Sequence, residues 1–188
     1  MNLVRQGHNQ VAGDLVAGNK TENTYHVVHA ASNDELSLLY AKLKSNGSGD
    51  ASDGTFCEQL EHYLAAKTDG DVRGLEEKLV GSGRQEQLAF AIELKEKAAK
   101  AVMKYQTSRT AQRIYTIVLD ELHTRFTLTV TPIIQDGAGR REVDLGIQKI
   151  LEEIKTMLGE NVLELTVKDI LALLYFLGGN CHIRWDKC

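Results

Sequence analysis

The side chains best suited to chemistry lie at the C-terminal end of the chain. Cys181, His182 and Cys188 carry thiol and imidazole groups, which ligate metals or act as nucleophile and base. A closed zinc site needs four ligands, and no second CxxC or HxxxH pair completes one; Cys57 is distant in the sequence. Adjacent residues of an extended tail point to opposite faces, so His182 is poorly placed to activate Cys181. We therefore expect no metal site and no catalytic dyad, and predict a packed tail with Cys181 and Trp185 in the core.

The common phosphate-binding and catalytic motifs are absent elsewhere in the sequence. No HExxH, GxSxG or DxDxDG pattern occurs, and Gly81-Ser-Gly83 lacks the third glycine and the lysine of a phosphate loop. The pair Arg140-Arg141 is isolated, and the acidic pairs lie on amphipathic, solvated helix faces. The sequence therefore predicts no enzyme activity and no cofactor.

Length and composition predict one helical domain with an additional arm. The chain has 188 residues, of which 43% are apolar and 26% charged, with a net charge of −4 and a single proline. One proline favours long helices, and the slight acidity provides no bulk attraction to nucleic acid or to an anionic membrane. The N-terminus lacks the apolar run of a signal peptide, and the apolar stretch 170–177 is too short to span a bilayer. We therefore expect a cytoplasmic, mainly α protein.

The elements that would position these residues begin with a glycine-rich arm over residues 1–31. Gln10–Asp14 (QVAGD) and Leu15–Asn19 (LVAGN) form an imperfect five-residue repeat, in which valines favour strands and glycines favour turns. Two short strands cannot bury an apolar face alone, so copies from several subunits would stack to close it. The alternative is a flexible arm. The residues predicted to mediate oligomerisation are Val11, Gly13, Asp14, Val16, Gly18 and Asn19.

A helix over residues 32–45, a flexible linker over 46–54 and a helical domain over 55–188 follow the arm. The linker is predicted from its three glycines and three serines among residues 45–54, and it marks a domain boundary. Within the domain, the nearly all-apolar helix at 170–177 is predicted to be central, and an extended tail follows it. Residues 124–134 are rich in β-branched side chains and form either a strand or a frayed helix end before Pro132.

Several segments, preceded by the VAGD-type segment at Gln10–Asp14, resemble the C-terminal domains of bacterial ABC-three-component conflict systems. The most specific is the motif Asn180–Trp185 (NCHIRW), made of Asn180, Cys181, His182, Ile183, Arg184 and Trp185; GLEEKL at 74–79 and SRTAQRIY at 108–115 are also similar. The resemblance implies defence against phages or other invading DNA, with the domain joined to an effector and connecting it to an SMC-like ABC ATPase. No effector domain precedes the arm, so we expect a stand-alone adaptor or sensor subunit.

Three hypotheses follow from the sequence. The first is a non-enzymatic oligomerisation and docking subunit whose partner is an ABC ATPase or an effector. The alternative is a nucleic-acid-contacting regulator of a phage or mobile element, with a basic face built from scattered arginines: Arg109, Arg113, Arg125, Arg140 and Arg141. The third is an enzyme that uses Cys181 or His182.

Overall fold

The computed structural model describes residues 34–46, 54–67 and 73–186. These residues form helices throughout, with no strand among them, so the mainly α fold class is confirmed for this part of the chain. The predicted β-repeat arm lies outside the described residues. The α-helices are α1 (Asp34–Asn46), α2 (Glu58–Leu64), α3 (Leu75–Gly81), α4 (Leu88–Lys104), α5 (Arg109–Arg125), α6 (Thr131–Gln135), α7 (Arg140–Met157) and α8 (Val167–Gly179). A 3₁₀ turn, η1 (Gln85–Gln87), precedes α4, and a π-helix, η2 (Phe126–Val130), joins α5 to α6.

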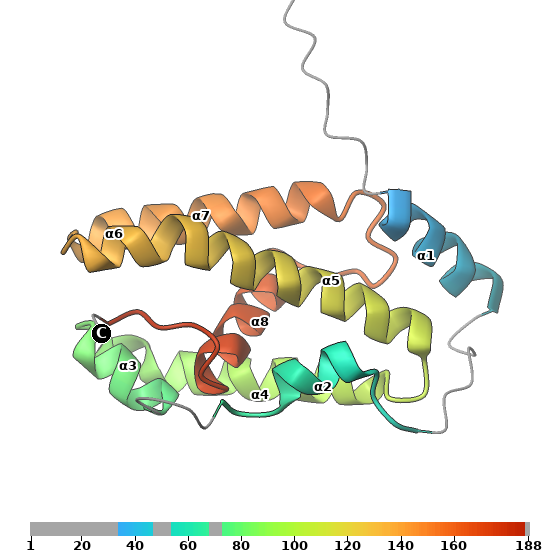
Figure 1. The fold of residues 1–188 in the computed structure, drawn as a ribbon, viewed down its shortest axis with the longest axis horizontal. Helices are drawn as coiled ribbons and strands as arrows, with labels where there is room; N and C mark the ends of the chain where they lie inside the picture. The colour runs from blue at the N-terminus through green and yellow to red at the C-terminus, as the bar shows by residue number, and fades with distance from the viewer. Residues whose placement is uncertain (1–33, 47–53, 68–72, 187–188) are drawn as a thin grey trace, which may run out of the picture.

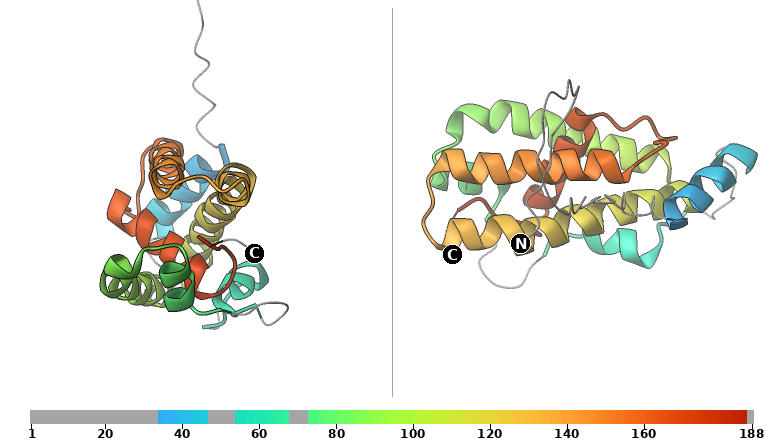
Figure 2. Two further views of the ribbon diagram at one scale, coloured as in Figure 1. Left: turned by 90° about the vertical axis from the view of Figure 1, so that its left-hand side faces the viewer. Right: turned by 90° about the horizontal axis from the view of Figure 1, so that it is seen from above.

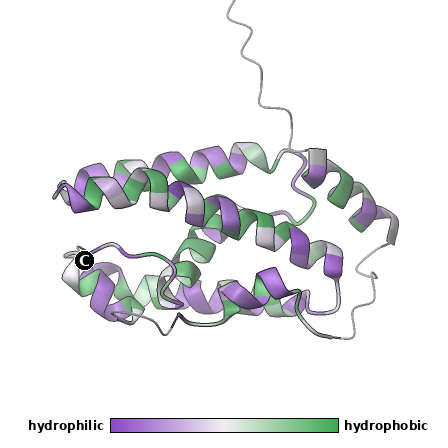
Figure 3. Ribbon diagram, in the orientation of Figure 1, coloured by the Kyte–Doolittle hydropathy of each residue, from purple (hydrophilic) through white to green (hydrophobic). Residues whose placement is uncertain are grey.

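Helix α8 lies between two layers of helices. One layer contains α5, α6 and α7, the other contains α2, α3 and α4, and α8 crosses the space between them (Figures 1 and 2). Its residues 172–178 are all buried, and the apolar colouring of the helix in Figure 3 reflects this position. A helix that is apolar on every side must be surrounded by other elements. The prediction that this helix is central is confirmed.

The first turn of α8 is fixed by a reciprocal cap. The hydroxyl of Thr166 accepts a hydrogen bond from the Asp169 backbone N–H at 3.2 Å, and the Asp169 carboxylate accepts one from the Thr166 N–H at 2.9 Å. Lys97 of α4 pairs with the same carboxylate at 2.7 Å. These contacts tie the start of α8 to α4, its most extensive helix partner. The alanines Ala91 and Ala98 on the buried face of α4 allow the two helices to approach closely.

Residues 124–134 form neither a strand nor a frayed end, and the helix continues through them to Gln135. The Thr131 N–H bonds to the carbonyl of Phe126, five residues back, which is the bond of a π-turn. Pro132 has no N–H, and its ring would press on the carbonyl four residues before it in a regular α-helix. The wider turn before Pro132 relieves this contact, while Phe126 and Val130 remain fully buried. Neither of the two alternatives left open by the sequence is observed, because burial outweighs the local preference of β-branched residues for strands.

Helix α1 packs across α5 and forms a second, smaller core. Leu36, Tyr40 and Leu43 are buried against Ala111 and Ile114. The Glu35 carboxylate forms an ion pair with Arg113 at 2.8 Å, and Lys44 forms one with Glu160. The helix predicted over residues 32–45 is therefore observed, and its apolar face is the one that packs on α5. The predicted domain boundary at 46–54 stays a prediction, because residues 47–53 lie outside the described residues.

Candidate functional site

The NCHIRW tail folds back against the helical core. After α8 ends at Gly179, Cys181 adopts a left-handed backbone conformation with φ of 64° and turns the chain. The tail then passes between α3 and the α5–α6 layer (Figure 1). Ile183 and Trp185 are buried, and the Trp185 ring lies 5.9 Å from the Phe126 ring and 5.6 Å from the Tyr175 ring, measured between centroids. The predicted packed tail is confirmed for Trp185, which lies in the core, whereas Cys181, predicted to lie there too, is only half-buried.

Gly178 makes this tail position sterically possible. A Cβ atom at residue 178 would lie 2.3 Å from Cζ3 and 2.6 Å from Cη2 of Trp185. Non-bonded carbon atoms do not approach this closely, so the indole ring occupies the space that a side chain at 178 would need. Gly178 is therefore required for the packing of the tail against α8.

Polar contacts hold the tail on three sides. The Asn180 side-chain amide donates to the Tyr63 carbonyl at 2.9 Å, and the Cys181 thiol donates to the Arg73 carbonyl at 3.3 Å. The ammonium of Lys78 donates to the Gly178 carbonyl at 2.6 Å. Lys78 is only 1% exposed, and burial lowers the pKa of its ammonium, although Cys181 nearby opposes that shift. The carboxylate of Asp186 pairs with Arg73 and also lies 3.4 Å from Arg184 Nε.

The imidazole of His182 lies in a cluster of rings contributed by α2 and α5. Its centroid is 5.1 Å from those of His62 and Tyr63 and 6.0 Å from that of His123. Burial lowers the pKa of His182 to about 4; repulsion from Lys67 and His62 adds to this, and the Ala65 carbonyl opposes it.

The pKa of His123 is also lowered, mainly by burial and then by Lys67. His182 and His123 are therefore neutral near pH 7. The Tyr63 hydroxyl, in contrast, is anchored by a 2.6 Å bond to Asp120, and its pKa is raised by burial and by that carboxylate.

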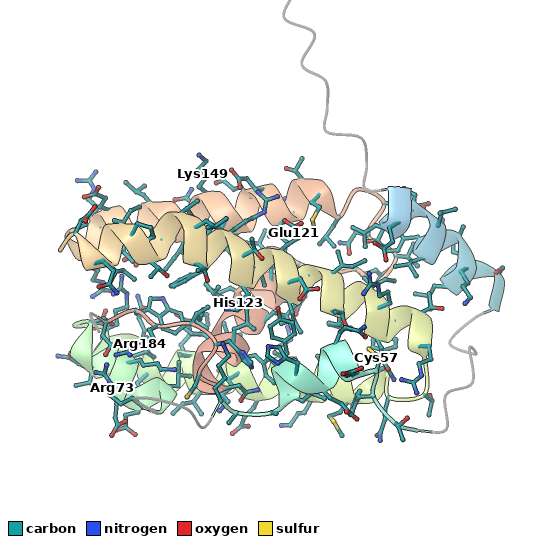
Figure 4. The ribbon with its side chains drawn as sticks, in the orientation of Figure 1. Cys57, Arg73, Glu121, His123, Lys149 and Arg184 are labelled. Carbon is teal, nitrogen blue, oxygen red and sulfur yellow. The ribbon has the colours of Figure 1, made fainter. Side chains whose placement is uncertain are left out.

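Cys181 and His182 engage different partners. The thiol faces the Arg73 backbone, whereas the imidazole faces His62, Tyr63 and His123. Cys57 lies far from the tail, beside Thr116 at 3.8 Å, as Figure 4 shows by its distance from Arg73 and Arg184. Within the described ranges, no three His, Cys, Asp or Glu side chains are arranged to hold a metal ion. Cys188 lies outside those ranges.

A groove separates the tail from one face of the helix that runs through α5, η2 and α6. It has a volume of about 260 Å³. One wall is formed by side chains spaced at about one helical turn, and the other by tail residues 181–184 and Asp186. The helical wall consists of His123, Thr127, Thr131, Ile134 and Gln135. The sequence did not reveal the helical wall of the groove. Its residues lie on one face only if residues 124–134 are helical, which the sequence left open.

A second polar cluster joins α7 to the turn before α4. Arg84, which is 2% exposed, donates to Asp144 at 2.7 Å and to the Ser82 carbonyl at 3.3 Å. Arg140 bridges Asp144 at 3.4 Å and Glu86 at 2.5 Å. These contacts satisfy the buried guanidinium, and hydrogen bonds to charged groups stabilise more than neutral ones. The sequence analysis missed this cluster, because its members are far apart along the chain.

The five arginines considered for a basic face are mostly engaged within the protein. Arg113 and Arg125 form ion pairs with Glu35, Glu121 and Glu153. Arg140 belongs to the cluster described above, and Arg109 donates to Thr55 at 3.0 Å. These carboxylates neutralise most of the positive charge that a nucleic-acid surface would require.

These features describe a helical domain closed by a packed C-terminal tail. Residues 74–185 match the model of C-terminal domain 9 of the ABC-three component (ABC-3C) systems, a match that spans more than half of the chain. The chain therefore belongs to the CTD9 family of ABC-3C systems. The matched region begins at the start of α3 and ends at Trp185, so it includes the tail and its motif. No curated protein and no solved structure matches the chain.

None of the described helices is both long enough and apolar enough to cross a bilayer.

Proposed function

We propose that this chain is a non-enzymatic adaptor subunit of an ABC-3C conflict system, active against phages or other invading DNA. It self-associates through the arm at residues 1–31 and docks an SMC-like ABC ATPase or an effector through the helical domain. Membership of the CTD9 family supports the setting. The observation that carries the adaptor role is the use of the motif Asn180–Trp185 for packing: its amide, thiol and apolar side chains hold the tail in place.

The arrangement of the tail favours docking over catalysis. The imidazole of His182 faces His62, Tyr63 and His123 and not the thiol of Cys181, which bonds to a backbone carbonyl. Lys78 lies beside that thiol, but its ammonium donates to the Gly178 carbonyl and so holds the backbone in place. A tail locked onto a rigid core provides instead a fixed surface, which is what a docking module needs.

Co-expression with the ABC ATPase and the remaining component of the same system tests the docking role. We expect the three proteins to purify as one complex, with a mass by light scattering that includes this chain. If the full chain elutes alone while the other two associate with each other, the adaptor role is refuted.

Self-association is tested on the chain without partners. We expect the full chain to have at least three times the monomer mass and residues 32–188 to have a smaller mass. Gly13→Val combined with Gly18→Val removes the glycines required for turns and should give the same reduction. If the double variant keeps the mass of the full wild-type chain, the arm is not the assembly device.

A further inference from the structure

Lys78 is a buried amine whose neighbour is a thiol. Its side chain is 1% exposed, and its Nζ donates to the carbonyl oxygen of Gly178 at 2.6 Å. The backbone N–H of Cys181 donates to the same oxygen at 3.3 Å, so one acceptor holds both the amine and the residue that carries the thiol. The thiol of Cys181 is itself a hydrogen-bond partner of the Lys78 amine. The fold therefore brings together a nitrogen and a sulfur that lie far apart in the sequence.

The thiol of Cys181 is held in a fixed direction. It donates to the carbonyl of Arg73 at 3.3 Å, and Arg73 lies just before α3, the helix that carries Lys78. Residue 181 has a φ of 64°, a left-handed conformation that favours glycine, yet it carries a side chain. Both polar partners of the thiol thus come from α3 and the residue before it, which fixes the sulfur beside the amine.

A small oxidant can reach the sulfur from the groove beside the tail. Cys181 is half-buried and lines this groove, which has a volume of about 260 Å³. Such a volume admits water-sized molecules, and hydrogen peroxide is only slightly larger than water. Lys78 is not among the described residues that line the groove. A peroxide that enters the groove therefore meets the thiol before it meets the amine.

Burial favours the form of Lys78 that can react. Burial lowers the pKa of the Lys78 ammonium, and the thiol of Cys181 opposes that shift. The charge of Asp186 also opposes the lowering of this pKa, whereas the charge of Lys95 adds to it. Only the neutral amine has a lone pair, and buried lysines supply it more readily than exposed ones. The neutral amine can keep one N–H on the Gly178 carbonyl while its lone pair faces the sulfur.

We propose that a peroxide converts Cys181 and Lys78 into a covalent cross-link with a sulfur–nitrogen bond. In the first step the sulfur attacks one oxygen of hydrogen peroxide and the O–O bond breaks; the thiol proton goes to the departing oxygen, which leaves as water. The sulfur is oxidised by two electrons to a sulfenic acid, and the peroxide is reduced.

The second step is a condensation without net oxidation or reduction. Lys78 Nζ attacks the sulfur of the sulfenic acid, the S–O bond breaks, and the leaving hydroxide takes a proton from the nitrogen and departs as a second water. Sulfenic acids condense in this way with nitrogen to give sulfenamides. Two equivalents of a small thiol reverse the reaction, because they reduce the S–N bond to the thiol and the amine and become a disulfide. The cross-link fixes the tail to α3, and it does not depend on the proposed adaptor function.

The test uses the full chain with a single thiol. Cys57→Ser and Cys188→Ser leave Cys181 as the only cysteine and remove the disulfides that would also release two hydrogen atoms. The folded chain is treated with hydrogen peroxide, and mass spectrometry of the intact chain and of its tryptic peptides follows. We expect a single chain lighter by two hydrogen atoms, in which the peptides carrying Lys78 and Cys181 are joined. Dithiothreitol should separate them.

Two lysines near the turn provide a matched pair of control variants. Lys95 approaches Gly179, since a Cβ atom there would lie 2.7 Å from its Nζ, so Lys95→Gln removes a neighbouring amine and should leave the cross-link intact. Lys78→Gln keeps an N–H donor for the Gly178 carbonyl and should abolish the cross-link, so that the peptide carrying Cys181 only gains oxygen atoms. Far-UV circular dichroism and the emission of the single tryptophan establish that each variant is folded. If Lys78→Gln does not fold, the joined peptides of the chain that retains both lysines still decide the question.

The fold itself provides a further control. In urea, peroxide should add oxygen to Cys181 without joining it to Lys78, because the unfolded chain no longer holds the two atoms together. A folded chain whose Cys181 peptide only gains oxygen, or loses hydrogen without joining the Lys78 peptide, overturns the proposal. A cross-link to Lys95 also overturns it. Joined peptides that retain an additional oxygen atom between them refute the sulfur–nitrogen step.

Discussion

The close contact between Gly178 and Trp185 leads to a sharp prediction for a single methyl group. In Gly178→Ala the new Cβ would lie 2.3 Å from Cζ3 of the indole, whereas ordinary contacts begin at 3.4 Å. The ring must therefore move by more than 1 Å, and Trp185 is 4% exposed in a packed environment. Overpacking of this kind costs about 1–3 kcal/mol.

Gly179→Ala is a matched control one residue away. Its Cβ would lie 2.5 Å from Cε of Lys95, which is the far end of a flexible side chain that can move aside. Replacing glycine by alanine in a helix stabilises it by up to about 1 kcal/mol, with less effect at a helix end. Both variants gain this contribution, so the difference between them isolates the clash with Trp185.

The assay is urea unfolding followed by circular dichroism and by the emission of Trp185, the single tryptophan of the chain. We expect Gly178→Ala to be less stable than Gly179→Ala by about 1–3 kcal/mol, with a melting temperature lower by about 2–10 °C. The native emission of Gly178→Ala should also shift to longer wavelength as the ring leaves its site. Equal stability of the two variants together with wild-type emission would refute the reasoning.

Three further predictions concern buried polar groups. The folded pKa of His182 is near 4, below the usual 6.5, so between these values the unfolded chain binds a proton that the native state does not, and the free energy of unfolding decreases as the pH is lowered. Lowering the pH from 6.5 to 5 should cost about 1.5 kcal/mol, and urea titrations should show a shallower pH dependence for His182→Gln; identical slopes would contradict this. Asp144→Asn should lower the free energy of unfolding by about 1–3 kcal/mol in the same assay, because the buried Arg84 loses its carboxylate partner. An unchanged urea midpoint would show that the Arg84–Asp144 pair does not stabilise the fold. Tyr63→Phe should cost about 1 kcal/mol through loss of the bond to Asp120, whereas a more stable variant would show that this bond is strained.

Periodicity predicted the helical elements well where one face is apolar and the other polar. The stripe of α1, the alanines of α4 and the all-apolar α8 with its Thr166–Asp169 cap were all recognisable, because helical spacing and caps are local properties. Residues 124–134 were not recognisable. Their β-branched side chains favour a strand locally, and only burial of Phe126 and Val130 against the rest of the core holds them in a helix.

The motif Asn180–Trp185 was identified from the sequence, but its surroundings were not. Lys78 stands three residues after Leu75 on the buried face of α3, and this spacing was the only available signal that a lysine would be buried. The lysine is tolerated there because its ammonium donates a hydrogen bond to the Gly178 carbonyl, which lies 100 residues away in the chain. Arg84 with Asp144, and His123 with His182, likewise meet only in the folded chain.

The sequence by itself determined a helical domain, a central apolar helix and a packed tail, because composition, periodicity and capping depend on near neighbours along the chain. The tertiary structure alone decided that the space beside Gly178 is occupied by Trp185, and that a groove lies between the tail and residues 123–135. The contact of Gly178 with Trp185 depends on the sharp turn that joins α8 to the tail. The groove depends on how the tail packs against a helix more than 40 residues away in the chain. That placement follows from packing the whole core at once, and no short stretch of sequence encodes it.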